Sequence, residues 1–95
     1  MPAPDAHRAV LRALDRMLPE GTAILTSEAE PWASATFSGA RHLVLVECVD
    51  LHAAVDIVSA LPEHEFSVPG HIMIDANGLA AGTAVAVELL TVEDR

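Results

Sequence analysis

The side chains of this sequence best suited to chemistry are one cysteine and five histidines. Cys48 and His52 stand four residues apart, and His64 and His71 stand seven apart. A zinc site needs three or four nitrogen, sulfur or oxygen ligands that converge on the ion. These spacings match no zinc-site pattern, so neither a metal nor another cofactor is predicted. A pocket near these four residues, at which at least three of them converged, could still bind a metal or a small molecule or support catalysis, and this is our alternative hypothesis.

Cys48 is also a candidate nucleophile. It precedes the second predicted helix by two residues, where the helix dipole would lower the pKa of its thiol, and His52 in the first turn could act as a base. The flanking carboxylates of Glu47 and Asp50 would raise that pKa instead. No glycine-rich segment nearby suggests an oxyanion hole. We therefore expect a buried, unreactive thiol and a protein that is not an enzyme.

Arginine supplies all the basic charge, and three of the five arginines form the one cationic cluster. Arg8, Arg12 and Arg16 recur four residues apart in the first predicted helix, where they could bind phosphate or an acidic partner. No aromatic residues lie among them, and 14 acidic residues give the chain a formal charge of −9. Because an acidic chain repels nucleic acid and anionic lipid, neither is predicted as a partner.

Size and composition limit the possible folds. Ninety-five residues make one domain, 1–95, and an apolar content of 52% excludes a disordered chain. No apolar run approaches the roughly 18–20 residues of a membrane span. A first segment containing Asp5 and Asp15 does not read as a signal peptide. The expectation is a cytoplasmic protein, and the absence of lysine beside abundant alanine, valine and arginine is typical of a GC-rich bacterial genome.

Two helices are predicted to support these residues. The first begins at an N-cap, Asp5, after a frayed segment 1–4, and ends before Pro19. The second follows the N-cap Asp50 and ends at Pro62. Its apolar side is predicted to carry Leu51, Ala54, Val55, Val58 and Leu61.

Between the helices, the alternation from Trp32 to Val49 predicts a β-hairpin. We place its turn at 38–41, which pairs Phe37 with His42. This register gives the hairpin one core face, made of Ala33, Ala35, Phe37, His42, Val44, Val46 and Cys48. Segment 22–27 is ambiguous and could form a further strand.

The second half of the sheet follows the second helix. Residues 71–75 and 83–92 both alternate and are predicted to be strands. Asn77-Gly78 is a strong turn signal between them, although Gly82 allows a longer loop.

This order, α-β(β)-β-α-β-β, predicts an α+β fold in two layers. A four- or five-stranded antiparallel sheet would carry two helices on one face. The order also equals a ferredoxin-like unit whose first strand has moved to the end, an analogy that carries no function.

The back of the predicted sheet is unusually apolar. If both hairpins share one sheet, this face gathers seven apolar residues, namely Trp32, Leu43, Leu45, Met73, Ala84, Ala86 and Leu90. A patch of this composition could exceed what a monomer usually exposes. Two copies stacked by a two-fold axis would bury it, with an interface of Trp32, Leu43, Leu45, Met73 and Ala86. Our preferred hypothesis is a small non-enzymatic interaction module that forms a homodimer.

Three strings of the sequence support one resemblance. They are PWASATFSGARH (31–42), EFSVPGHIMID (65–75) and LTVED (90–94). The chain resembles small uncharacterised proteins of GC-rich bacteria. The resemblance implies a standalone α+β protein and brings no activity, cofactor or functional residue with it.

Overall fold

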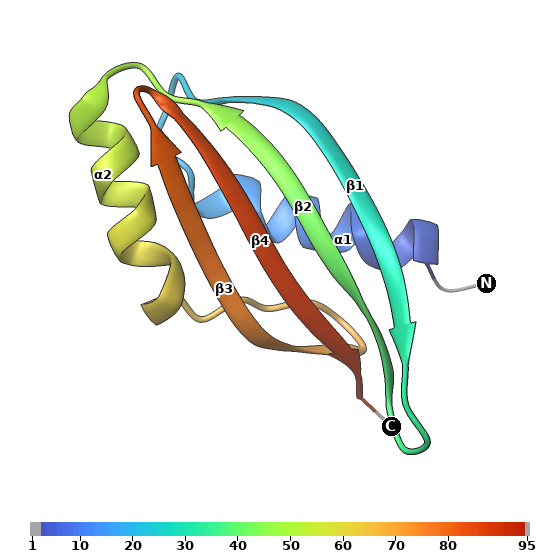
Figure 1. Ribbon diagram of the computed structural model, residues 1–95. Coiled ribbons are helices and arrows are strands. Elements are labelled where there is room, and N and C mark those ends of the chain that lie inside the picture. Colours follow the sequence, from blue (N-terminus) through green and yellow to red (C-terminus); the bar gives the residue numbers. More distant parts are fainter. Residues whose placement is uncertain (1–2, 95) are drawn as a thin grey trace.

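The computed structural model describes residues 3–94, with side chains from Ala6 onward. Its elements, in chain order, are α1 (Ala3–Met17), β1 (Ala23–Ala33), β2 (Ser38–Glu47), α2 (Leu51–Ala60), a short 3-10 turn η1 (Leu61–Glu63), β3 (His71–Ala81) and β4 (Ala84–Glu93). The four strands form one antiparallel sheet in the order β1-β2-β4-β3 (Figure 1). The predicted α+β class and element order are confirmed.

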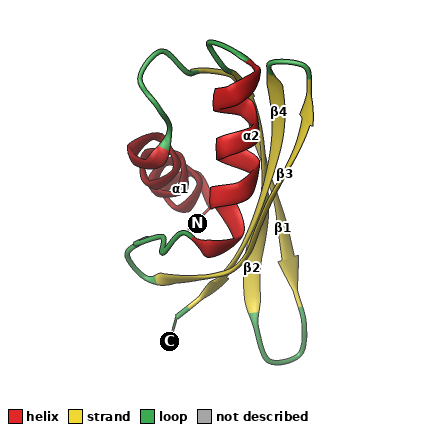
Figure 2. Cartoon of the chain, turned by 90° about the vertical axis from the view of Figure 1, so that its left-hand side faces the viewer, coloured by secondary structure: helices red, strands yellow, loops and turns green. Residues whose placement is uncertain are grey.

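Both helices pack on the same face of the sheet, which makes the two layers that the sequence predicts (Figure 2). β2 and β3 run parallel to each other with β4 between them, because each of them pairs antiparallel with β4. α2 makes the crossover between these two parallel strands. No helix within residues 3–94 is both long and apolar enough to cross a membrane.

The core lies between the helices and the inner face of the sheet. His42, Val44 and Val46 on β2 and Cys48 just after it are all buried, as the alternation predicts. β4 adds a second buried row, and the helices close the core with residues that include Val10, Leu14, Ile57 and Leu61. Full burial of each such aliphatic side chain contributes about 1.5–3 kcal/mol.

The predicted register of the first hairpin is wrong. The strands pair Ala33 with Ser38, and the turn is formed by 34–37. The side chain of Ser34 explains this position, because its hydroxyl oxygen accepts the backbone N–H of Phe37 at 3.1 Å. Ala35 and Phe37 therefore lie in the turn and not on the core face. The shift is an even number of residues, so the predicted inward residues of β2 keep their face.

The ambiguous segment 22–27 belongs to β1, which continues without a break to Ala33. The sheet therefore has four strands, and the five-stranded alternative is wrong. The turn predicted at Asn77-Gly78 is also wrong, because both residues lie inside β3. Gly82 makes the turn instead, with a φ of +63° that favours glycine. A Cβ on Gly78 would press on the side chain of Leu61, so this glycine lets the helical layer approach the strand.

The helix boundaries agree in part with the prediction. α1 already begins at Ala3, so Asp5 is not its N-cap; of the predicted frayed segment, Ala3 and Pro4 are helical and residues 1–2 lie outside the described residues. The cap of α2 is confirmed, since Asp50 accepts the backbone N–H of Ala53 at 2.8 Å. α2 is rotated from its predicted orientation. Its buried residues are Ala53, Ala54 and Ile57, while Leu51 and Val55 are exposed.

Candidate functional site

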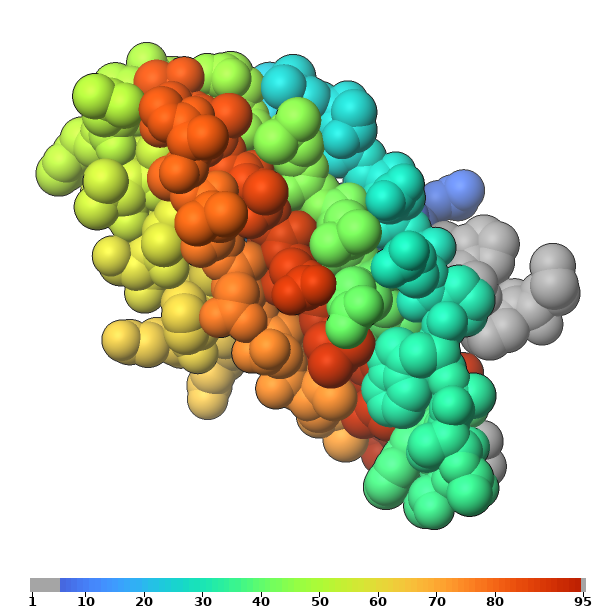
Figure 3. All heavy atoms as spheres, viewed as in Figure 1, coloured from blue at the N-terminus to red at the C-terminus, as the bar shows by residue number. Residues whose placement is uncertain are grey.

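The outer face of the sheet has no helix over it, and it fills the front of the molecule in Figure 3. Leu43 and Leu45 alternate with the buried residues of β2 and so point to this face, where both are half-buried. Trp32 and Ala86 share the face through their cross-strand partners. Four of the five predicted interface residues are therefore on the open face.

Met73, the fifth, is not on this face. The pairing of β3 with β4 is irregular between Met73 and Asp75, which is a β-bulge at Ile74. The extra residue reverses the alternation, so Met73 packs against the core. The open face instead receives Ile72 and Leu79, whose exposed fractions are 48% and 76%.

The strand register arranges the open face in five rows that run across the sheet. The first, beside the turn between β3 and β4, consists of Ala23, Glu47, Ala84 and Ala81. Two of the other rows are apolar. One consists of Leu45, Ala86 and Leu79 beside Thr26, and the other of Trp32, Gly39, Val92 and Ile72. The two rows between them carry the remaining charges. They are Glu28, Leu43, Glu88 and Asn77, and then Glu30, Arg41, Leu90 and Asp75.

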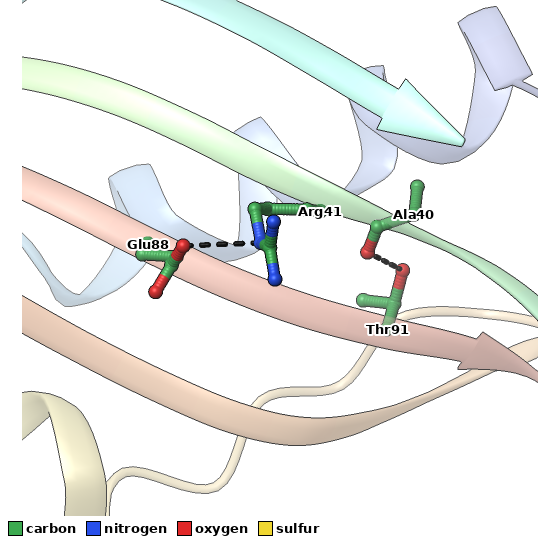
Figure 4. A network of polar contacts seen from close by, with 4 residues as sticks. All are labelled: Ala40, Arg41, Glu88 and Thr91. Atoms are coloured by element: carbon green, nitrogen blue, oxygen red, sulfur yellow. Dashed lines mark hydrogen bonds and ion pairs between the residues drawn. The ribbon is translucent and has the colours of Figure 1, made fainter. Parts of the chain in front are cut away.

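An ion pair joins the two charged rows. Arg41 Nε lies 3.1 Å from a carboxylate oxygen of Glu88, with both side chains about half exposed (Figure 4). The remaining acidic residues of these rows leave the face with more negative than positive charge. The apolar residues of this surface suit protein contact, although most of its charges lie in the middle rows, whereas protein interfaces usually carry their charges at the rim.

A chain of hydrogen bonds crosses the opposite side of the molecule, between α1 and the sheet. His7 Nε2 lies 3.2 Å from Ser27 Oγ, and His7 Nδ1 lies 2.9 Å from His42 Nδ1. His42 Nε2 lies 3.0 Å from Thr91 Oγ1, whose hydroxyl donates to the carbonyl of Ala40 at 3.3 Å (Figure 4). The two imidazole rings are within 4° of parallel with centroids 5.2 Å apart, so they meet edge to edge.

One proton arrangement satisfies every member of this chain. Thr91 gives its only hydroxyl proton to Ala40, so it accepts from His42 Nε2. His42 Nδ1 then has no proton and accepts from His7 Nδ1, which leaves His7 Nε2 to accept from Ser27. Both imidazoles are neutral in this arrangement, and the buried polar groups of the inner face are paired.

The surroundings of the two histidines favour their neutral forms. His42 is fully buried, and desolvation together with repulsion from His7 and His71 lowers its pKa to about 4. Burial also lowers the pKa of His7. Within the described residues, no carboxylate forms an ion pair with either ring.

Ser27 and His7 resemble an activated hydroxyl and its base, with His42 orienting the base. However, four clefts of the described residues, with volumes of about 360 to 710 Å³, include none that is lined by both Ser27 and His7. None of these four clefts therefore presents the pair to a substrate. Sequence reasoning missed this chain because His7 and His42 are 35 positions apart. The one available signal was the position of His42 on a predicted core face, where a histidine requires partners.

The predicted pocket of Cys48, His52, His64 and His71 does not form as a unit. His64 and His71 line one open cleft of about 710 Å³ beside the start of β3. Cys48 follows the last residue of β2, far along the sheet from this cleft, and its backbone N–H donates to the carbonyl of Thr83. His52 lies on α2 and faces Asp56. Residues 3–94 contain no group of three or more side chains able to hold a metal ion.

The electrostatics of Cys48 agree with the expectation of an unreactive thiol. Its side chain is buried, and desolvation raises its pKa, with Glu47 and Asp50 adding to the effect. The thiolate, which is the nucleophilic form, is therefore disfavoured at neutral pH.

Comparison with protein-family models, curated proteins and solved structures finds nothing similar to this chain.

Proposed function

We propose that this protein is a small interaction module that forms a homodimer through the open face of its sheet. The observation that carries the proposal is the uncovered face itself. Both helices occupy the other side, while Leu43, Leu45, Leu90 and Trp32 are only half-buried and Leu79 is exposed. A sheet face with this many apolar residues normally packs against a second layer.

The row pattern makes a second copy a suitable second layer. A two-fold axis parallel to the strands places each row against the same row of the other copy. Apolar rows then meet apolar rows, and the charged middle rows meet the charged middle rows. Within the middle, the Arg41–Glu88 ion pair keeps two of the charges satisfied inside each chain.

The excess of carboxylates on the face opposes this contact at low salt. Glu28, Glu30 and Asp75 have no arginine or lysine partner within the described residues. Repulsion between exposed like charges is screened within about 10 Å at 0.1 M salt. The dimer is therefore expected to tighten as salt is added, the reverse of an interface held by ion pairs across the contact.

The test is a pair of matched substitutions followed by sedimentation velocity. Ala86→Glu puts a carboxylate at an exposed position in one apolar row. Leu45→Asp puts a carboxylate at the half-buried position that pairs with Ala86 in the same row. Leu51→Asp is the control, since Leu51 is exposed on α2, away from the sheet face. We expect the first two variants to be monomers and the control to keep the dimer. Equal masses for all three and the parent chain would reject the proposal.

A second candidate function is small-molecule binding in the cleft beside β3. One observation favours it, because His64 and His71 line this cleft together with Glu65 and Asp75. His71 donates from Nδ1 to the carbonyl of Pro69 at 3.0 Å, so its Nε2 is free to accept from a ligand. Native mass spectrometry of protein purified without chelator tests this role. A retained small molecule that is lost in His71→Ala would support it, and a bare chain would count against it.

A further inference from the structure

We propose that the Ser27–His7–His42–Thr91 chain is a proton-sensitive latch that holds α1 against the sheet at neutral pH and releases it in acid. The latch is independent of the proposed dimer, because it lies on the helix-covered face. Within the described residues, His7 makes the only side-chain hydrogen bonds between α1 and the sheet. The other attachments of α1 are apolar, through residues such as Val10, Ala13 and Leu14.

The chain tolerates one additional proton. A proton added to His7 Nε2 reverses the hydrogen bond with Ser27, whose hydroxyl can accept as well as donate. His7 Nδ1 continues to donate to His42 Nδ1. The singly protonated pair therefore keeps every connection between the helix and the sheet.

A second proton breaks the chain. The remaining basic nitrogen is His42 Nδ1, which already receives the proton of His7 Nδ1 over 2.9 Å. Protonation there places two N–H groups against each other and two positive charges on adjoining rings. Within residues 3–94, the neighbouring strands supply no negative charge to stabilise this second proton. His71 on β3 also repels a positive charge on His42, and Arg41 on β2 points to the opposite face of the sheet. Glu93, a carboxylate on the same face of β4 as Thr91, pairs across strands with His71 and forms no ion pair with either ring.

Separation of the two rings relieves this conflict. His42 lies on the interior strand β2 and is fully buried, whereas His7 is half-buried in the first turns of α1. Moving the first turns of α1 away from the sheet lets water reach both imidazolium rings. The expected acid state keeps the sheet and α2 and loosens α1.

Amide hydrogen exchange of the full-length protein tests the latch, with protection corrected for the intrinsic effect of pH. We expect the protection of α1 to fall by up to about tenfold per pH unit in acid, since each opening takes up a proton. The protection of α2 should change much less. Simultaneous loss of protection in both helices would overturn the proposal, because it would indicate ordinary acid unfolding.

Two variants separate the latch from a structural role of the histidines. His7→Asn retains an N–H that can donate to His42 but takes up no proton, so the pH dependence of α1 protection should flatten. His42→Gln should also flatten the pH dependence of α1 protection. If this variant of a fully buried residue does not fold, His7→Asn, at a half-buried position, tests the latch alone. His52→Gln, at an exposed histidine, is the control and should behave as the parent chain. An unchanged pH dependence in His7→Asn would refute the latch.

Discussion

The two faces of the sheet differ in whether the chain itself supplies partners for the side chains on them. The inner face buries polar groups, His42 and Thr91, yet each finds a hydrogen-bond partner from α1 or a neighbouring strand. The outer face exposes apolar groups, such as Leu79 and Ile72, and no element of the described chain covers them. The polar groups His42 and Thr91 of the inner face are therefore paired within one molecule, whereas our proposal assigns the cover of the outer face to a second copy.

The largest expected effect of a mutation is on the inner face. Leu89→Ala removes a fully buried side chain from the core and should lower the free energy of unfolding by about 2–5 kcal/mol. Leu43→Ala, on the outer face, removes the same atoms from a half-buried site and should cost less. Chemical denaturation at one fixed protein concentration, low enough for the chain to be a monomer, measures both. Equal losses would contradict the distinction between the faces.

Acid should destabilise the inner face next most strongly. The pKa of His42 is about 4 in the folded protein against 6.5 for an exposed histidine. Between these values the unfolded chain binds more protons, so stability falls as the pH is lowered from about 6.5 to about 4. The difference between the two pKa values corresponds to a loss of about 3 kcal/mol in the free energy of unfolding. Denaturation as a function of pH checks this, and a His42→Gln variant should lose less stability over the same range.

The charged middle of the outer face should contribute least to folding. The side chains of the Arg41–Glu88 pair are about half exposed, so Arg41→Ala should change the free energy of unfolding by about 1 kcal/mol or less. A loss comparable to that of Leu89→Ala would show that this face is buried more deeply than in the isolated chain. The same measurement at high salt should reduce the effect further.

Much of the fold was predictable because alternation and capping act locally. The inward residues of β2 and the Asp50 cap follow directly from the order of residue types. The failures occur where distant residues decide. Asn77-Gly78 is a turn signal in isolation, but both residues lie in β3, where the missing side chain of Gly78 leaves room for Leu61. Ser34, rather than a glycine, makes the first hairpin turn through its side-chain hydrogen bonds.

The candidate sites were predictable to different degrees. The open face needed only the period of β2 and β4, so Leu43, Leu45 and Ala86 could be placed from the sequence. Met73 could not, since nothing in the sequence marks the bulge at Ile74 that turns it inward. The histidine chain depends on how α1 docks, which brings His7 to a residue 35 positions away. Local patterns carry no information on such docking.

The mass of the native protein in solution tests the central claim most directly. Sedimentation velocity at micromolar concentration should give twice the 10.0 kDa of one chain, with a larger dimer fraction at about 0.5 M salt than at about 0.05 M. Such a result would show that a second copy covers the open face, provided that Ala86→Glu removes it. A chain that sediments as a monomer at both salt concentrations would contradict the account.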